Sequence, residues 1–315
     1  MDYRKCIAVF GLWLVPIAAL SHTSAIGLGR ERGQFMNCPD KSFPVISATR
    51  VTSDSKTADL WTCWYDGAPV HTLPLPAPDI VSRVARAGQV FAADAVEVTP
   101  LGTQWIRLKS GTEGKRLYVP LAYCRRVAPE NIAGSDLPIG RENLGPYDGL
   151  PANYRPSDLV AVPSRYCYSD LPQELRAEAL EACLQMLDAA RRETGLTIKI
   201  LSAYRSAQTQ AYLCRQKIES AGIEQRLVAR PGHSEHQLGT AVDLVGDGGM
   251  YLLHELFNTT GEGRWLQLNS HRFGFVPSYS RQRALDEGTP YEPWHFRYVG
   301  RDNIEPFQAD GDVRE

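Results

Sequence analysis

The sequence predicts an α+β fold in which a small all-β region precedes a mixed region of helices and strands. Residues 26–128 consist of short runs of β-branched and aromatic residues, which Gly, Pro and Asp interrupt and which lack a helical repeat. Residues 151–305 instead alternate helical apolar stripes with short apolar runs. At 315 residues the chain has room for both regions as separate domains.

Strands of the first region are predicted from three short runs, at residues 90–92, 105–108 and 117–120. The stretch 71–123 resembles a bacterial SH3-like domain, through its Trp-Ile-Arg-Leu run, then Gly114-Lys115, then a Tyr-Val-Pro segment. A small SH3-like barrel is therefore expected from about residue 70. The stretch 38–66 lies outside this resemblance.

Residues 129–150 are rich in Gly, Pro, Asn and Asp, and we expect them to form a linker. A helix should follow, with Ser169 or Asp170 as its N-cap and Gly195 at its end. Its buried stripe comprises Leu175, Leu180, Cys183, Leu184, Leu187 and Ala190. Strands are further predicted at 197–201, 241–245, 273–276 and 296–299, and helices at 207–220 and 264–270. Residues 306–315 form a tail.

Residues 1–25 have the layout of a secretory signal peptide. Arg4 and Lys5 precede an uncharged stretch, and Thr23 and Ala25 are small residues at suitable positions for cleavage. An uncleaved membrane anchor is the alternative, which the short apolar run and Pro16 disfavour. We therefore expect an exported protein, periplasmic or associated with the cell wall, without a stable membrane span after cleavage.

The expected export determines how the cysteines are interpreted. Six remain once the signal leaves, namely Cys38, Cys63, Cys124, Cys167, Cys183 and Cys214. An even count in an oxidising compartment predicts up to three disulfides, in any of about fifteen pairings. Three cysteines fall on each side of residue 140, so full pairing requires one bridge between the halves. Cys183 fits a buried thiol on a helix face equally well.

Composition excludes several classes of protein. The formal net charge is −2 and the basic residues are scattered, which argues against nucleic acid as the main partner. Apolar residues make up 43% of the chain, which is enough for a sizeable core and disfavours global disorder.

A candidate zinc site comes from three possible ligands in the last third of the chain. Catalytic zinc takes three protein ligands and keeps a fourth position for water, and His236, Asp243 and His295 supply that set. Glu292 lies three residues before a ligand and can accept a proton from the attacking water. By residue type alone, each histidine could be structural, Asp243 could begin a turn, and Trp294 and His295 could be a packed pair. The order and spacing of these residues favour the metal site.

The segment 150–300 resembles the LAS-type metallopeptidases, in their D-alanyl-D-alanine carboxypeptidase branch. The group is named for lysostaphin, D-Ala-D-Ala peptidases and Sonic hedgehog. Two motifs of the first part of this segment carry the resemblance: Ser-Ala-Tyr-Arg-Ser at 202–206 with Gln210, and the stretch 231–244, which begins Pro-Gly-His-Ser-Glu-His and ends with Asp243 and Leu244. Further matching motifs follow it: Trp-Leu at 265–266 with Asn269, Phe-Gly-Phe at 273–275, and Glu-Pro-Trp-His-Phe-Arg-Tyr-Val-Gly at 292–300. The resemblance implies a peptidase domain over 151–305, a small antiparallel sheet flanked by helices.

The resemblance also implies roles for single residues. It implies Zn²⁺ held by His236, Asp243 and His295, with Glu292 as the catalytic base. Arg205 matches an arginine that faces the substrate, and Ser234 and Gln210 match polar residues of the same pocket. His233 is expected to line that pocket or to support the ligands.

The planar fork of Arg205 suits a free C-terminal carboxylate, although an arginine in a surface ion pair is the plainer alternative. Residues 278–290 depart from the family pattern in what should be a loop, since they carry Arg281, Arg283, Asp286 and Glu287. This departure leaves substrate preference less certain than catalysis.

These features predict a zinc D-alanyl-D-alanine carboxypeptidase that trims peptidoglycan stem peptides. An L,D-carboxypeptidase or a peptidoglycan endopeptidase is the neighbouring alternative. A non-catalytic peptidoglycan-binding protein is the rival from another class, and the four intact site residues argue against it.

Overall fold

The computed structural model describes residues 47–49, 59–100, 102–109, 116–126, 137, 139, 149–287 and 289–304. The expected signal peptide, Cys38, most of the expected linker and the expected tail lie outside these ranges. Among the described residues, no helix has the length and apolar character needed to cross a membrane.

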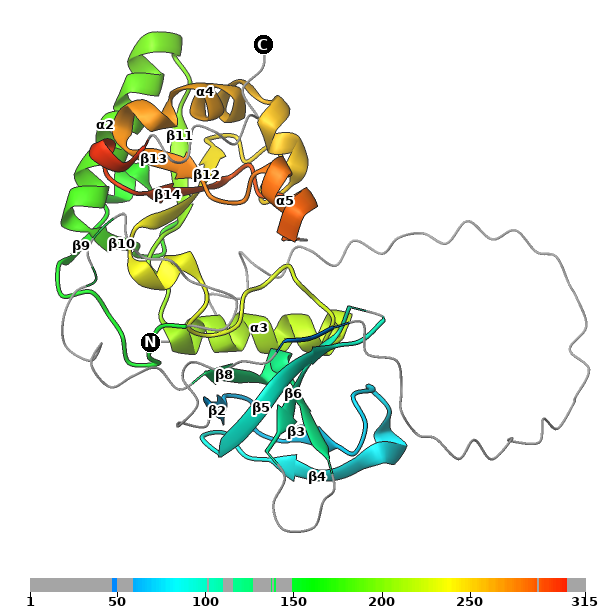
Figure 1. The fold of residues 1–315 in the computed structure, drawn as a ribbon. Coiled ribbons are helices and arrows are strands. Elements are labelled where there is room, and N and C mark those ends of the chain that lie inside the picture. The colour runs from blue at the N-terminus through cyan, green and yellow to red at the C-terminus, as the bar shows by residue number, and fades with distance from the viewer. Residues whose placement is uncertain are drawn as a thin grey trace, which may run out of the picture. The chain divides into compact units, whose positions relative to one another are not determined.

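The first part of the chain forms one eight-stranded antiparallel sheet, drawn in blue to teal in Figure 1. Its strands follow the order β4-β3-β7-β6-β5-β2-β8, with β1 paired to β5. Their bounds are β1 Ser47–Thr49, β2 Asp59–Cys63, β3 Ala68–His71, β4 Val81–Ala85, β5 Val90–Val98, β6 Gln104–Leu108, β7 Leu117–Pro120 and β8 Cys124–Arg126. Trp61, Ile106 and Val119 are fully buried in its core. The three runs predicted as strands are confirmed, and we name this element the N-terminal sheet.

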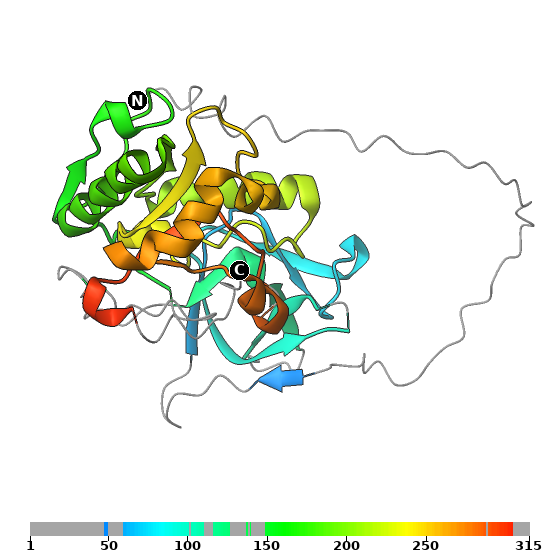
Figure 2. The same cartoon turned by 90° about the horizontal axis from the view of Figure 1, so that it is seen from above.

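A second, four-stranded antiparallel sheet lies in the C-terminal part of the chain, in the order β11-β12-β14-β13. Its strands are β11 Ile198–Ser202, β12 Ala241–Gly246, β13 Phe275–Pro277 and β14 His295–Tyr298. The helices α2 Ala177–Thr194 and α4 Gly261–Asn269 lie along it in both views (Figures 1 and 2). They share one hydrophobic cluster with the sheet. The prediction of a mixed fold with antiparallel sheets is confirmed.

The alternation of side chains along β12 and β14 determines which residues face away from this cluster. Val242 and Leu244 pack into the hydrophobic cluster with α2 and α4, and so do Phe296 and Tyr298. Successive side chains of a strand point to opposite faces. Asp243 lies between Val242 and Leu244, and His295 directly precedes Phe296. The side chains of Asp243 and His295 therefore project from the other face of the sheet.

Two of the predicted helix ends are confirmed. Gly195 ends α2 in the left-handed conformation, with φ 76°. The helix α3, Ala207–Ala221, begins after Ser206, whose hydroxyl accepts a hydrogen bond from the Thr209 N–H, and it ends at Gly222. These caps satisfy backbone groups that a helix end leaves without partners.

The predicted start of α2 is wrong. The helix begins at Ala177, because Glu174–Arg176 forms the strand β10, which pairs with β9 Leu159–Ala161. The Arg176 N–H donates to the Gly239 carbonyl at 2.9 Å, and its guanidinium binds Asp158 at 2.9 Å. Contacts with distant parts of the chain thus hold this segment extended.

The expected loop at 278–290 contains a helix, α5 Arg281–Glu287. Ser280 begins it, since its hydroxyl accepts from the Arg283 N–H at 3.1 Å and its carbonyl from the Ala284 N–H at 3.0 Å. Short 3₁₀ helices complete the described elements: η3 Pro78–Ile80, η4 Leu121–Tyr123, η6 Ser164–Tyr166, η7 Glu235–Leu238, η8 Glu255–Thr259, η9 Ser270–Phe273 and η10 Arg301–Asn303.

The five described cysteines are free thiols, so no predicted disulfide is formed among the described residues. Cys183 is fully buried in the cluster under α2, where burial raises the pKa of its thiol to about 12. It is the buried helix-face thiol that the sequence allowed as an alternative.

Candidate metal centre and active site

Three predicted ligands come together from two strands and a short helix. Asp243 of β12 and His295 of β14 are directly opposite each other in the antiparallel register. His236 lies in η7, and Gly239 in the left-handed conformation turns the chain from that helix toward β12. The ligand atoms of the three residues all lie within 4.8 Å of one another, and all three side chains are buried.

The carboxylate of Asp243 lies between the two imidazoles. Its Oδ2 is 3.2 Å from His236 Nε2, and its Oδ1 is 3.1 Å from His295 Nδ1. His236 Nδ1 is 2.7 Å from the Ala203 carbonyl. That carbonyl can only accept, so it fixes the proton on Nδ1 and leaves the Nε2 lone pair directed into the cluster.

A second carboxylate, that of Glu235, contacts the other ring nitrogen of His295. Glu235 Oε2 is 2.9 Å from His295 Nε2, and Arg297 donates to Glu235 Oε1 at 3.1 Å. A carboxylate on the far nitrogen of a ligating imidazole orients the ring and raises its basicity. Glu235 and Arg297 were not among the predicted site residues. Two signals could have indicated them, because Glu235 adjoins His236 and Arg297 lies two residues beyond His295, on the same strand face.

The mutual contacts of the cluster shift its pKa values. Burial opposes ionisation of Asp243, yet His236 and His295 together hold the pKa of that carboxyl well below its usual range. Burial likewise opposes ionisation of Glu235, but His295 and Arg297 lower its pKa to about 2. Burial lowers the pKa of His236. The cluster thus holds ionised carboxylates beside imidazoles, which suits a cation.

Glu292 precedes β14 and differs from these carboxylates. Burial raises its pKa to about 7, with a further upward contribution from Asp243 and opposing contributions from His295 and Arg205. Its backbone N–H donates to the Tyr279 carbonyl at 3.0 Å, and its carbonyl accepts from the His295 N–H at 3.1 Å. A carboxyl group with a pKa near neutrality can both take up and release a proton at physiological pH.

Of the three residues predicted to bind substrate, Arg205 and Ser234 lie beside this cluster. The backbone N–H of Arg205 donates to the His236 carbonyl at 3.1 Å. The guanidinium of Arg205 interacts electrostatically with Asp243 and Glu292. Ser234 is buried at the N-cap of η7. Gln210 donates to the Ala229 carbonyl at 2.7 Å. Among the described residues, Arg205 Nε and Gln210 Oε1 are buried without a hydrogen-bond partner.

Two further side chains define the surroundings. The Tyr279 ring meets His295 edge to face, with centroids 4.9 Å apart, and sequence reasoning did not indicate it. His233, predicted to line the pocket, is turned toward the chain at Gly149, where a Cβ would approach its Nε2 to 2.8 Å.

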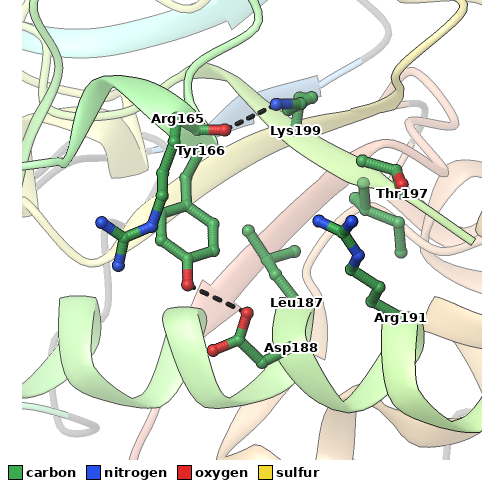
Figure 3. Close-up of a pocket in the computed structure, with 8 residues that line it drawn as sticks. Arg165, Tyr166, Leu187, Asp188, Arg191, Thr197 and Lys199 are labelled. Atoms are coloured by element: carbon green, nitrogen blue, oxygen red, sulfur yellow. Dashed lines mark hydrogen bonds between the residues drawn. The ribbon is translucent and has the colours of Figure 1, made fainter.

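A cavity of about 340 Å³ lies elsewhere, between α2, η6 and β11 (Figure 3). Figure 3 shows Tyr166 donating to Asp188, at 2.9 Å, and Lys199 donating to the Arg165 carbonyl. No predicted site residue lines this cavity, so it is not part of the metal centre.

The donor set fits Zn²⁺. Zinc in proteins prefers imidazole nitrogen and carboxylate oxygen, and a catalytic site uses three protein ligands with one position left open. His236, Asp243 and His295 provide two nitrogens and one carboxylate whose ligand atoms lie within 4.8 Å of one another. Fold and donor set together define an α+β domain with a candidate metal site on its sheet.

Comparison with known proteins identifies the family. The model of the VanY family, D-alanyl-D-alanine carboxypeptidase, matches residues 172–301. The bifunctional D-Ala-D-Ala dipeptidase and D-Ala-D-Ala carboxypeptidase VanXYC of Enterococcus gallinarum is 31% identical over 160 residues, covering 48% of this chain and 78% of that protein. The chain belongs to the VanY family of D-alanyl-D-alanine carboxypeptidases.

Other relatives match over part of their length. YodJ of Bacillus subtilis strain 168, a protein named as a carboxypeptidase, is 36% identical over 156 residues, covering 48% of this chain and 57% of YodJ. The chain thus spans about half the length of this relative and of a second one, of which it covers 46%.

Two solved structures are also similar. The LD-carboxypeptidase LdcB is 35% identical, covering 51% of this chain and 77% of that one, with a TM-score of 0.48. The D,D-pentapeptidase VanY of a VanB-type resistance cassette, solved with Zn(II), is 30% identical, covering 53% and 89%, with a TM-score of 0.40.

Proposed function

We propose that this protein is a zinc-dependent D-alanyl-D-alanine carboxypeptidase that removes the terminal D-alanine from peptidoglycan stem peptides. One observation carries the proposal: the buried cluster of His236, Asp243 and His295, with Glu292 and Arg205 interacting with it electrostatically. Family membership supports the reaction class.

His236, Asp243 and His295 would hold the Zn²⁺, which when bound supplies Lewis acidity toward the scissile carbonyl and lowers the pKa of a coordinated water. Glu292 takes the proton from the attacking water and later delivers it to the departing amine of D-alanine. Burial raises the pKa of this carboxyl to about 7 in the metal-free site, and a carboxyl group that titrates near neutrality can both accept and release a proton.

Arg205 orients the substrate in this proposal. Its guanidinium has an unpartnered Nε among the described residues, and a planar fork of donors matches a C-terminal carboxylate. Gln210 Oε1 and the hydroxyl of Ser234 add polar groups to the same pocket. A carboxylate bound in this way makes the last residue of the stem peptide the leaving group.

The same proposal gives a role to each remaining part of the chain. Peptidoglycan lies outside the cytoplasmic membrane, so residues 1–25 act as the signal peptide of an exported, periplasmic or wall-associated enzyme. In this proposal residues 26–128 are the β-rich domain, SH3-like from about residue 70, residues 129–150 the linker, residues 151–305 the zinc peptidase domain and residues 306–315 the tail.

Digestion of purified muropeptides with the zinc-loaded full chain, followed by mass analysis of the products, tests the proposal. We expect pentapeptide stems to lose one D-alanine while tetrapeptide stems stay intact. Loss of D-alanine from tetrapeptides alone would mean an L,D-carboxypeptidase, and cleavage of crosslinked dimers an endopeptidase. A protein that cleaves none of these substrates but sediments with sacculi would be a binding protein, and the proposal would be wrong.

A further inference from the structure

Two cysteines face each other where β2 pairs with β8, the last strand in the order of the N-terminal sheet. Cys63 ends β2 and Cys124 begins β8, and they are direct partners in the antiparallel register. Both are buried, with 1% and 0% of their surface exposed. Neither residue belongs to the metal centre or to the proposed substrate pocket.

The backbone hydrogen bonds around Cys63 determine how close the pair lies. The Cys63 N–H donates to Gln89 and its carbonyl accepts from Gly88, so both groups point away from β8. On the side of β8, the next residue, Trp64, donates to the Tyr123 carbonyl at 3.0 Å. Cys63 and Cys124 are therefore a non-hydrogen-bonded pair.

Such pairs are the closer of the two kinds in an antiparallel ladder, with Cα atoms about 4.5 Å apart. That separation falls within the range of roughly 4.4–6.8 Å over which disulfides bridge two residues. The backbone therefore needs no rearrangement for the two sulfurs to bond.

The two thiols already interact. A hydrogen bond from Cys124 lowers the pKa of the Cys63 thiol, while burial raises the pKa of Cys124 well above its usual range. Cys63 itself donates to the Tyr65 carbonyl at 3.0 Å. The side chains of Cys63 and Cys124 are thus already in contact in the folded sheet.

A third cysteine in the same hydrophobic cluster is the obvious competitor. Cys214 lies on α3, and it packs with residues of the N-terminal sheet. Its sulfur is 3.9 Å from the Val228 carbonyl and 3.7 Å from Gln225 Nε2. These contacts come from the chain segment that follows α3, whereas Cys63 and Cys124 contact each other.

We propose that Cys63 and Cys124 form a disulfide that joins β2 to β8 in the exported protein. The compartment rests on the proposed function, since a peptidoglycan enzyme works where disulfides persist. The co-reactant is a small disulfide such as oxidised glutathione. One of the two cysteine thiolates attacks one of its sulfurs and releases a thiol; the thiolate of the other cysteine then displaces the second thiol from the mixed disulfide. Two protein thiols are oxidised, the small disulfide is reduced to two thiols, and the protons of the cysteines pass to them.

The burial of Cys63 and Cys124 determines when the disulfide can form. Both sulfurs are inaccessible in the folded sheet, so the exchange takes place before β2 and β8 are covered, during folding. Once formed, the bond is shielded from reductant for the same reason. We therefore expect dithiothreitol to reduce it in unfolded protein and to leave it intact in the native state.

Peptide mapping of the full chain tests the proposal. The reduced, unfolded protein is refolded in a buffer of reduced and oxidised glutathione, alkylated in denaturant without further reduction, digested and analysed by mass spectrometry. We expect a crosslinked peptide that contains Cys63 and Cys124. Alkylation of both residues, or a crosslink from either one to any other cysteine, would overturn the proposal.

Matched variants sharpen the result. Cys167→Ser and Cys214→Ser each remove one cysteine outside the pair, and both should keep the crosslink. Loss of the crosslink in Cys214→Ser would contradict the assigned pairing. The double variant Cys63→Ser/Cys124→Ser should unfold at a temperature lower by roughly 5–15 °C than the oxidised wild type. If that variant does not fold, the wild-type peptide map still decides.

This outcome is separable from the test of function. A chain that forms the bond and releases no D-alanine would refute the proposed activity only. A chain that releases D-alanine while both thiols remain free would refute the disulfide only.

Discussion

Asp243 and His295 are direct cross-strand partners of β12 and β14, and the Oδ1 of the aspartate is 3.1 Å from the Nδ1 of the histidine. Facing residues of an antiparallel pair have Cβ atoms about 4.5–5.5 Å apart, so the ladder itself fixes the spacing of these two candidate ligands. His236 adds the third ligand from outside the sheet. Two of the three residues of the candidate metal site thus lie on paired strands of the C-terminal sheet.

Removal of one ligand should abolish tight zinc binding. We expect His236→Ala or His295→Ala to weaken zinc affinity by more than the roughly 10–100-fold that follows loss of an outer-sphere partner. Titration against a chromophoric chelator measures this affinity. His271→Ala, which removes an exposed histidine of η9, is the control and should bind zinc like the wild type. Equal affinity of all three variants would exclude the assigned ligands.

Glu235 should act through His295 as a positioning residue. Glu235→Gln keeps the shape of the side chain but loses the charge that orients His295 and pairs with Arg297. We expect zinc affinity to fall by about 10–100-fold. Glu193→Gln removes a carboxylate from an exposed ion pair with Arg272 and serves as the control. A Glu235→Gln protein with wild-type affinity would show that the contact orients nothing.

Arg205 should be responsible for recognition of the substrate carboxylate. The wild type is expected to cleave a peptide with a free C-terminus much faster than its C-terminal amide. Arg205→Lys should raise KM for the free acid about tenfold or more and reduce this discrimination, because lysine lacks the planar fork. Arg215→Lys, an exposed arginine stacked on Tyr65, is the matched control. If Arg205→Lys discriminates as well as the wild type, another group binds the carboxylate.

The ionisation of Glu292 predicts an acid limb in the pH profile. The base works only when ionised, so activity falls as the pH drops through its pKa. Burial raises that pKa to about 7, and a bound cation nearby favours the ionised form and lowers it. We expect kcat to rise with pH up to a plateau, with its midpoint at or below about 7. Zinc content measured over the same range separates this limb from loss of metal, and a flat profile between pH 5 and 8 at full zinc content would contradict it.

Local signals allowed part of this protein to be predicted from its sequence. Gly195 predicted the end of α2 because capping depends on the residue at the helix end itself. The candidate ligands His236, Asp243 and His295 were predicted from residue type, order and spacing. The structure brings their ligand atoms together, and the register of β12 and β14 places Asp243 opposite His295.

The remainder depended on contacts between residues far apart in the sequence. The start of α2 was missed because Glu174–Arg176 pairs with β9, and no local feature reveals that pairing. The bond between Glu235 and Arg297 joins residues 62 positions apart. Tyr279 was missed because its contact with His295 arises only when the segment before α5 folds over the sheet.

The most direct test of the central claim compares the zinc-loaded wild type with Glu292→Gln. Both proteins should contain equal zinc, because Glu292 is not a ligand. We expect the variant to release D-alanine from a pentapeptide stem about 10²–10⁴-fold more slowly, since it lacks the proton acceptor. Glu255→Gln, an exposed glutamate of η8, controls for the substitution and should keep wild-type activity. Equal D-alanine release by Glu292→Gln and wild type at equal zinc content would contradict the account.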